Sequence, residues 1–183
     1  MPLDINKFFS SFTKSELARP SKFDVIFTIP DAVRIGDEKN PYYISNLDLA
    51  LRCETAQLPS RTLMTTEQKI YGITEKYPYE NSYTDAEFTF YVSGNMKEKI
   101  LFDRWLDYVS PRRSYHMNYK NNYQTTIKVT QYDLQNKEQY KIYLRKAFPL
   151  TVNQLDLDWS SDSVHKLTVV FAYSDWYMEA MVA

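Results

Sequence analysis

The side chains best suited to covalent chemistry are the single Cys53 and the two histidines, His116 and His165. A thiol activated by a neighbouring imidazole acts as a nucleophile in many enzymes. Cys53, however, continues an alternating apolar pattern with Leu49 and Leu51, which predicts a strand that holds the thiol on its apolar face. A cysteine on such a face packs like a small hydrophobic residue, so we expect a structural role and no catalytic site.

Metal-binding and acid–base patterns are incomplete. No Cys or His pairs occur at zinc-ligand spacing. Side-chain oxygens recur at every second position between residues 156 and 162, as in a calcium loop, but Ser161 and Leu167 replace the glycine and glutamate that such a loop needs. Asp156 and Asp158 resemble a glycosidase pair, but no further acid completes that site. We therefore expect no metal and no cofactor.

Residues 111–120 form the strongest basic and aromatic segment, with Arg112, Arg113 and Lys120 interleaved with tyrosines. Stacking combined with phosphate contacts is how proteins bind single-stranded nucleic acid. The segment is short and follows a predicted helix end, where cations complement the helix dipole. A solvated loop is the simpler interpretation, and a nucleic-acid-binding β-barrel remains an alternative.

The composition of the 183-residue chain narrows the functional class further. Lys and Arg number 22 against 23 Asp and Glu, so the net charge of −1 favours neither nucleic acid nor membrane as a partner. Only 3 glycines weigh against phosphate-cradling loops, whereas 16 tyrosines and 10 phenylalanines suit strands and protein interfaces. One cysteine excludes an internal disulfide, and no apolar run is long enough for a membrane span. The length predicts one domain, 1–183.

Apolar periodicity predicts a chain rich in strands. Leu101, Trp105 and Val109 recur at helical spacing, which predicts a core-facing helix over residues 96–109, and residues 4–12 predict a short N-terminal helix. The expected fold is mainly β, a β-sandwich or barrel with one helix packed at its side or end. Alternating or apolar segments predict strands at residues 23–29, 47–54, 86–92, 125–134, 138–146 and 164–177.

A corner is predicted between the last two strands. Pro149 is expected to end one strand. The Asp158 carboxylate is expected to accept hydrogen bonds from turn N–H groups, and the Trp159 indole to be buried beneath the corner.

Residues 60–84 separate two predicted strands by more than a usual loop length, and they are not rich in Gly or Ser. We expect an extended loop or hairpin that docks on a neighbouring molecule, since aromatic anchors suit interfaces. A loop packed on its own domain is the alternative. Phe8 and Phe9 of the predicted N-terminal helix could likewise pack either on a neighbouring molecule or on their own domain. Candidate interface residues in the long segment are Met64, Glu67, Ile70, Tyr71, Ile73 and Tyr77.

Several motifs, in order along the chain, resemble the tail tube proteins of contractile-tailed bacteriophages. They are ARPSKF at residues 18–23, CETAQLP at 53–59, Phe88 and Phe90 followed by Phe102, Asp103 and Trp105, AFPLTVNQLDLDW at 147–159, and KLTVVFAYSDWY at 166–177. The order and spacing of these motifs carry the resemblance more than any one of them does.

The resemblance implies a structural protein of the virion tail, assembled in the host cytoplasm, with no enzymatic activity. It implies hexameric rings whose inner sheets join into one barrel, and rings that stack into a tube for phage DNA. Expected partners are further copies, the tail sheath protein, the baseplate tube initiator, and the tail terminator and tape measure proteins. We also expect a lumen lined mainly by polar or acidic residues. A tube initiator or a secretion-needle subunit of the same build, as in type VI secretion, is the alternative.

Overall fold

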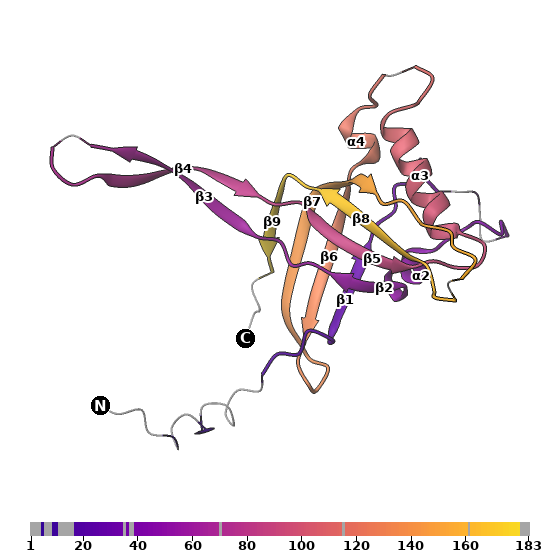
Figure 1. Cartoon of the computed structure of the whole chain (residues 1–183), viewed down its shortest axis with the longest axis horizontal. Helices are drawn as coiled ribbons and strands as arrows, with labels where there is room; N and C mark the ends of the chain where they lie inside the picture. The colour runs from indigo at the N-terminus through magenta and orange to yellow at the C-terminus, as the bar shows by residue number, and fades with distance from the viewer. Residues whose placement is uncertain are drawn as a thin grey trace.

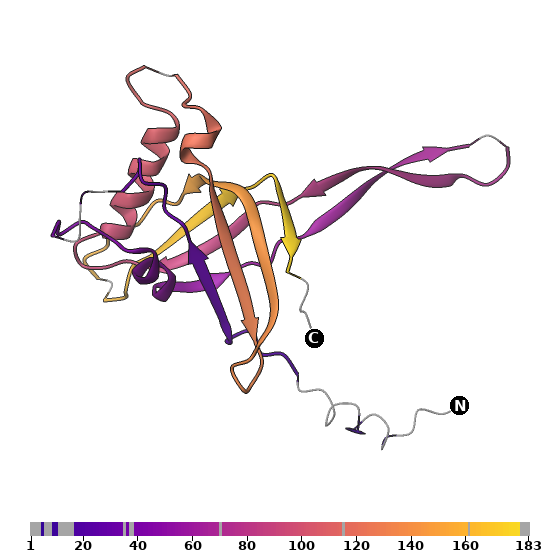
Figure 2. The same ribbon diagram turned by 180° about the vertical axis from the view of Figure 1, so that it is seen from behind.

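The computed structural model describes residues 5, 9, 10, 17–34, 36, 39–69, 71–114, 116–160 and 162–179. A β-rich body carries a helix at its side, and a long hairpin projects far from it (Figure 1, with the reverse view in Figure 2). In chain order the elements of the described part are β1 (Phe23–Phe27), α2 (Asn46–Leu51), β2 (Cys53–Ala56), β3 (Arg61–Gln68), β4 (Glu75–Tyr83), β5 (Ala86–Tyr91), α3 (Lys97–Val109), α4 (Lys120–Tyr123), β6 (Thr125–Tyr132), β7 (Glu138–Val152), β8 (Lys166–Ala172) and β9 (Asp175–Met178).

The body consists of two antiparallel sheets that share one strand. The strand order is β1-β6-β7-β8-β5-β2, and β9 also pairs with β7. The first part of β7 pairs with β6 and β9, whereas its last part pairs with β8. Between the two parts the register with β6 is irregular, and Lys146 there has a φ of 56°. Such a bulge bends a strand, which lets β7 pass from the β1-β6-β7-β9 sheet into the β7-β8-β5-β2 sheet.

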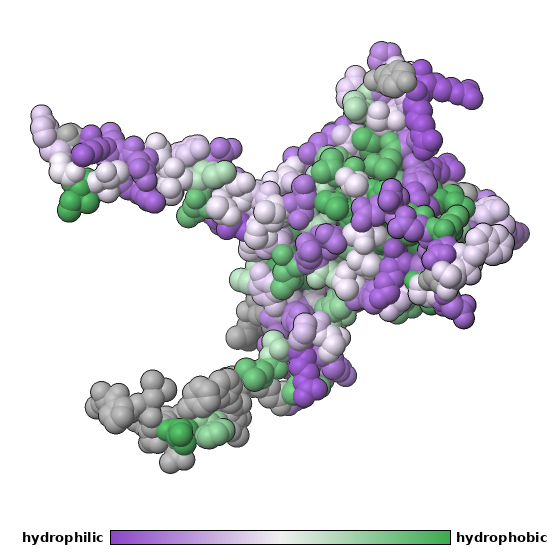
Figure 3. Space-filling model, viewed as in Figure 1, coloured by the Kyte–Doolittle hydropathy of each residue, from purple (hydrophilic) through white to green (hydrophobic). Residues whose placement is uncertain are grey.

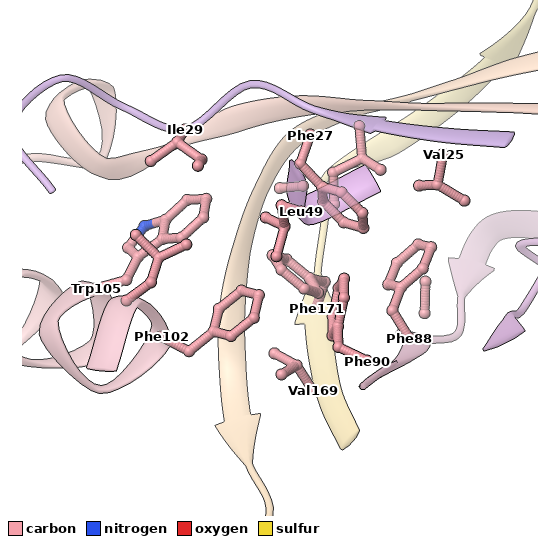
Figure 4. Packing of buried hydrophobic residues seen from close by; sticks show 14 of the residues in the cluster. Val25, Phe27, Ile29, Leu49, Phe88, Phe90, Phe102, Trp105, Val169 and Phe171 are labelled. Carbon is pink, nitrogen blue, oxygen red and sulfur yellow. The ribbon is translucent and has the colours of Figure 1, made fainter. Parts of the chain in front are cut away.

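Aromatic side chains from both sheets fill the space between them, which confirms the predicted mainly-β sandwich. The Phe27 ring of β1 lies 5.2 Å from Phe88 and 5.3 Å from Phe90 of β5, measured between ring centroids. Phe171 of β8 lies 5.6 Å from Phe88. Figure 4 shows these rings pointing toward one another, with Trp105 reaching in from α3. The alternating patterns of β1, β5 and β8 therefore predicted the correct inward faces.

Helix α3 forms where the sequence predicts it and covers one end of this core. Leu101 and Trp105 are fully buried, and Val109 is half-buried against the core. The Trp105 indole N–H donates a 2.9 Å hydrogen bond to the Tyr123 carbonyl, which ties α3 to α4. Since the indole is both buried and hydrogen-bonded, this residue fixes the position of α3 on the sheets.

A buried carboxylate fixes the start of α3. Glu98 is fully buried and accepts hydrogen bonds from the Ser93 backbone N–H and hydroxyl, both at 2.8 Å. Its other oxygen lies 2.8 Å from an Arg52 guanidinium nitrogen. The N-cap residue Met96 makes no side-chain hydrogen bond to the first turn of α3. The Glu98 carboxylate instead connects the start of α3 to Ser93 before it and to Arg52, which follows α2.

The prediction of a strand over residues 47–54 is wrong in its first half, which forms helix α2. The Ser45 hydroxyl accepts a hydrogen bond from the Asp48 N–H at 3.0 Å, and the Asp48 carboxylate accepts one from the Ser45 N–H at 3.4 Å. This capping box starts a helix that buries Leu49 and leaves Leu47 exposed. Strand β2 begins only at Cys53.

The prediction that Pro149 ends a strand is also wrong, since β7 continues through it to Val152. Pro149 is buried opposite Phe171 of β8, beside a register irregularity between Pro149 and Thr151. An irregular ladder tolerates a residue that has no N–H to donate. The single long strand predicted over residues 164–177 is two strands, β8 and β9, and they pair with different parts of β7.

The predicted corner at Asp158 forms, but without the expected burial of Trp159. The Asp158 carboxylate accepts hydrogen bonds from the Ser160 backbone N–H at 3.0 Å and from its hydroxyl. Trp159, however, has a relative exposure of 108%. The turn lies in the β7–β8 loop (residues 153–165), outside both sheets, so it directs the indole away from the core.

Candidate subunit interface

The hairpin formed by β3, β4 and their turn (residues 61–83) is anchored to the body only at its base. The Ser60 and Thr84 hydroxyl oxygens are 2.7 Å apart, so the two strands leave the body side by side. The Tyr173 hydroxyl donates to the Thr84 carbonyl at 2.6 Å, and its ring lies 6.2 Å from that of Tyr83. Beyond this base the hairpin extends freely from the body (Figure 1).

Cross-strand pairs set the register of the hairpin. It runs from Arg61 opposite Tyr83 to Gln68 opposite Glu75, with one irregularity near Met64. The Arg61 guanidinium donates to the Asn81 amide oxygen at 2.9 Å. Nearer the tip, Lys76 lies 3.6 Å from Glu67 across the strands. These contacts fix the strand pairing, but they bury little surface.

The hairpin exposes apolar and aromatic side chains that the body does not cover. Every residue of β3 is exposed, and Tyr71 and Ile73 at the tip have relative exposures of 95% and 88%. Figure 3 shows hydrophobic residues on the hairpin standing apart from those of the body. An isolated two-stranded hairpin is marginally stable in water, so the exposed apolar side chains make this segment a candidate interface.

The structure brings most of the predicted interface residues together on this hairpin. The side chains of the following predicted interface residues are exposed on the hairpin: Met64, Glu67, Tyr71, Ile73 and Tyr77. Ile70 lies outside the described residues.

The N-terminal part of the predicted interface is described only in places. Ile5, Phe9 and Ser10 are helical, and Phe9 is exposed, whereas Phe8 and the remainder of the predicted helix lie outside the described residues. The interface role of Phe8 and Phe9 therefore stays a prediction.

Sheet edges are a second interface feature, which the sequence analysis did not assign. Within the described part of the chain, β1, β9 and β2 each pair with a neighbour on one side only. Strands β1 and β9 are the two edges of the same sheet, β1-β6-β7-β9. An edge strand presents unpaired N–H and C=O groups that another strand can pair with.

The outward face of the β1-β6-β7-β9 sheet carries paired charges around two tyrosines. Two guanidinium nitrogens of Arg145 in β7 donate hydrogen bonds to the two carboxylate oxygens of Asp175 in β9. The bond from Nε to Oδ1 is 2.7 Å long. Lys141 lies 2.5 Å from the Glu138 carboxylate. The Tyr143 and Tyr177 rings stack at 5.0 Å between centroids. The alternation of Lys141, Tyr143 and Arg145 along β7 is the sequence signal that could have revealed this face.

These ion pairs shift the pKa values of their members. Hydrogen bonds from Arg145 hold the pKa of Asp175 below its usual 3.8, and the bond from Lys141 lowers the pKa of Glu138 below 4.5. Hydrogen bonds to the same carboxylates raise the pKa of Arg145 and of Lys141. Both pairs are therefore fully charged near neutral pH, and each cation is matched by an anion.

The thiol that the sequence singled out is poorly suited to nucleophilic chemistry. Cys53 packs against the core, and burial is the main cause that raises its pKa to about 12. A thiol with so high a pKa carries almost no thiolate at neutral pH. Among the described residues, no group of three or more His, Cys, Asp or Glu side chains is arranged to hold a metal ion.

The basic segment at residues 111–120 is engaged in part with the protein itself. The Arg112 guanidinium lies 2.6 Å from the Asp107 carboxylate. The Lys120 ammonium donates to the Ser174 hydroxyl at 3.1 Å and lies 5.5 Å from the centre of the Phe148 ring. The ion pair with Asp107 offsets one of the positive charges of this segment. No helix in the described residues is long and apolar enough to cross a membrane.

The described residues form a two-sheet antiparallel sandwich, with α3 at its side and a projecting hairpin that exposes aromatic side chains. The chain belongs to the phage tail tube protein family, whose model matches residues 18–179. The resemblance drawn from the sequence motifs is thereby confirmed. No curated protein matches the sequence.

Solved structures share the fold at low sequence identity. A chain of the sheath–tube complex of the extracellular contractile injection system PVC, in its extended state, matches with a TM-score of 0.63 at 17% identity, covering 94% of this chain and 97% of that one. A chain of the anti-feeding prophage baseplate matches with a TM-score of 0.61 at 20% identity, covering 92% and 99%. The SPP1 tail tube matches with a TM-score of 0.51 at 11% identity, covering 91% and 81%.

Proposed function

We propose that this protein is the subunit of an inner tail tube, which assembles into hexameric rings that stack along one axis. The observation that carries the proposal is the hairpin. Its strands pair correctly, yet its apolar side chains at Leu63, Tyr71 and Ile73 remain exposed. A second copy of the chain supplies the missing surface. A contact of this kind is heterologous, so it propagates into an open series and builds a tube.

Ring closure in this proposal uses the two edges of the β1-β6-β7-β9 sheet. Strand β9 of one copy pairs with β1 of the next, and repetition around the axis closes the sheets into one barrel. Closure removes every open edge of that sheet, which is the usual solution to the hazard of exposed edges. Both edge strands are short, with 5 residues in β1 and 4 in β9, so a single pair of edges contributes few hydrogen bonds before the ring is complete.

The outward face of this sheet then lines the channel through which phage DNA passes. Its cations are Lys141 and Arg145, which pair with Glu138 and Asp175, and Lys128, which lies opposite Tyr143 and near the Glu138 carboxylate. Asp24, opposite Thr130, adds a third carboxylate to this face. A matched face has little net attraction for phosphate, whereas unmatched cations would bind DNA through counterion release and slow its passage. A polar, charge-balanced lining therefore suits transport without sequence recognition.

The wider assembly follows from the tube role. We propose that the tube belongs to a contractile tail of the virion, is assembled in the host cytoplasm and carries no enzymatic activity. The sheath protein would surround it, the baseplate initiator would start it, and the terminator and tape measure proteins would set its end and length. The likeness to a chain of a sheath–tube complex supports the sheath as a partner.

A tube initiator of the same fold is the second candidate, supported by the comparable likeness to a baseplate chain, with a TM-score of 0.61. The two roles differ in how far assembly proceeds. A tube subunit forms long stacks by itself, whereas an initiator forms single rings that need another protein to continue.

Electron microscopy and analytical sedimentation of the concentrated, purified protein test the proposal. Long hollow tubes support the tube subunit, and rings that do not stack support the initiator. A monomer that shifts DNA mobility in a salt-sensitive way would contradict both and support the nucleic-acid-binding alternative.

A further inference from the structure

Along the free edge of β1, the directions of the backbone groups alternate in step with the side chains. The Tyr132 N–H donates to the Lys22 carbonyl at 2.9 Å, so every second residue counted from Lys22 bonds β6. The residues between them turn their N–H and C=O groups toward the free edge instead. These residues are Phe23, Val25 and Phe27, and their side chains pack in or against the core.

The free edge of β9 has the same arrangement. The Glu179 N–H donates to the Lys141 carbonyl at 3.0 Å, so Glu179 and Tyr177 direct their backbone groups to β7. Trp176 and Met178 therefore direct theirs to the free edge, and Trp176 packs against the core. When β9 of one copy runs antiparallel to β1 of the next, free backbone groups meet free backbone groups. The core faces of both copies then fall on one side and the outward faces on the other.

One row of residues crosses the sheet at right angles to its strands. Asp24 of β1 lies opposite Thr130 of β6, and Thr130 lies opposite Lys141 of β7. The Lys141 carbonyl in turn accepts the bond from Glu179. If Glu179 faced Asp24 of the next copy, the row would close on itself and the strands would stand parallel to the ring axis. A closed barrel instead needs tilted strands and a staggered register.

The handedness of β-sheets sets the direction of this stagger. Seen from the outward face with β1 running upward, β1, β6, β7 and β9 follow one another from left to right, as in Figure 2. Neighbouring strands are rotated by about −20 to −25°, so the strands of a closed barrel wind around its axis as right-handed helices. Seen from inside the barrel, such strands lean to the left at the top, and a row at right angles to them rises to the right. The row that leaves Glu179 therefore reaches the next β1 beyond Asp24.

We propose that Glu179 of one copy lies opposite Ile26 or Thr28 of the next copy, on the lumen side of the seam where β9 meets β1. This register rests on the proposed tube function and deepens it, because it fixes how the two edges pair. The four strands of one copy span about 19 Å, at about 4.8 Å per strand. A stagger of two residues, about 7 Å, tilts the strands by about 20°, and one of four residues by about 35°, close to the usual tilt in barrels.

The two competing registers differ in charge. Glu179 opposite Asp24 brings two carboxylates face to face, which is unfavourable. The opposite stagger places Glu179 against Lys22 and adds an ion pair, but it requires strands that wind in the left-handed sense. Ile26 and Thr28 are uncharged, so Glu179 keeps the 2.9 Å bond from the Tyr143 hydroxyl.

Disulfide formation across the seam tests the register. Ile26, Thr28 and Glu179 direct their backbone groups into their own sheet, so residues that face one another at these positions form the close, non-hydrogen-bonded kind of pair. The Cα atoms of such a pair are about 4.5 Å apart, a separation that a disulfide can bridge.

Two double variants combine Glu179→Cys with Ile26→Cys or with Thr28→Cys, and both are assembled and then oxidised. One of them should form a covalent ladder of up to six copies, in at least tenfold excess over two matched controls. The controls combine Glu179→Cys with Asp24→Cys or with Lys22→Cys. Wild-type protein, whose native thiol packs against the core, measures the background of the oxidation.

Co-assembly and unfolding measurements keep each outcome interpretable. A variant that assembles poorly is mixed with an equal amount of wild-type chain, and thermal unfolding shows that its monomer is folded. Wild-type protein that never forms rings or tubes would overturn the proposed function. Rings in which the Asp24→Cys or Lys22→Cys control cross-links as well as the other pairs would overturn only the stagger. Rings in which no pair cross-links would overturn the pairing of β9 with β1, and the register with it.

Discussion

Truncation of the hairpin separates folding from assembly. Residues 63–81 are removed, and Thr62 is joined to Ser82 through an Asn-Gly turn. Thr62 and Ser82 are direct partners in the ladder, so a two-residue turn closes the shortened hairpin without strain. The base contacts of Tyr83 and Thr84 with Tyr173 are kept.

The structure sets the expected magnitudes. Within β3 and β4 the removed residues are exposed, so the free energy of unfolding of the monomer should change by less than about 1 kcal/mol. Assembly should lose at least two aromatic or apolar anchors. Anchors at the centre of an interface contribute about 2 kcal/mol or more each. A loss of about 4 kcal/mol raises the critical concentration by about 1,000-fold, at about 1.4 kcal/mol for each factor of ten.

Thermal unfolding of the monomer and pelleting of assembled protein over a concentration series measure the two quantities. The full-length chain carrying the exposed but remote Tyr119→Ser substitution serves as the control for a lost surface aromatic. Tubes of the truncated protein at the wild-type critical concentration would refute the reasoning, since they would show that the hairpin contributes no assembly contact.

Three further changes test the body of the protein. Trp105→Ala should lower the free energy of unfolding by about 3 to 5 kcal/mol, measured by denaturant titration, because it opens a cavity and removes the bond to Tyr123. Glu98→Gln should lower it by about 2 kcal/mol, since a neutral amide weakens the charged bonds to Ser93 and Arg52. The pKa of Asp175 is depressed, so the stability from its pairing is present above about pH 4 and is lost as the pH falls through the folded value. Acid titration of Asp175→Asn should accordingly show a weaker loss of stability below pH 4 than wild type, and an identical acid profile would contradict this.

The inward faces of the strands were predictable from the sequence because burial acts on alternate residues. Phe88 and Phe90 alternate with polar residues, and the structure places both rings in the core. The same reasoning failed for Leu47, Leu49 and Leu51, since a short helix can also bury only one of three leucines. The capping box of Ser45 and Asp48 decides that segment, and it acts through two hydrogen bonds that an apolar pattern does not reveal.

Long-range pairing explains the remaining differences. Pro149 is compatible with β7 only because the ladder with β8 is irregular beside it, and that irregularity depends on residues about 20 positions later. Trp159 was expected inside because tryptophan is usually buried, but local turn chemistry at Asp158 places it outside. Its exposure is a property of the tertiary fold, which the pattern of residue types along the chain did not reveal.

The distribution of apolar side chains allows the folding of the body and the proposed assembly to depend on different residues. The fully buried aromatic residues all lie in the body, between the two sheets and under α3. The described residues of the hairpin contribute none of them, so substitutions there should alter the proposed assembly with little effect on folding. The edges of the β1-β6-β7-β9 sheet are different, because β9 is held by the Arg145–Asp175 pair that also balances the proposed lumen. Changes at that pair should therefore affect ring closure and channel charge together, whereas changes at the hairpin should affect stacking alone.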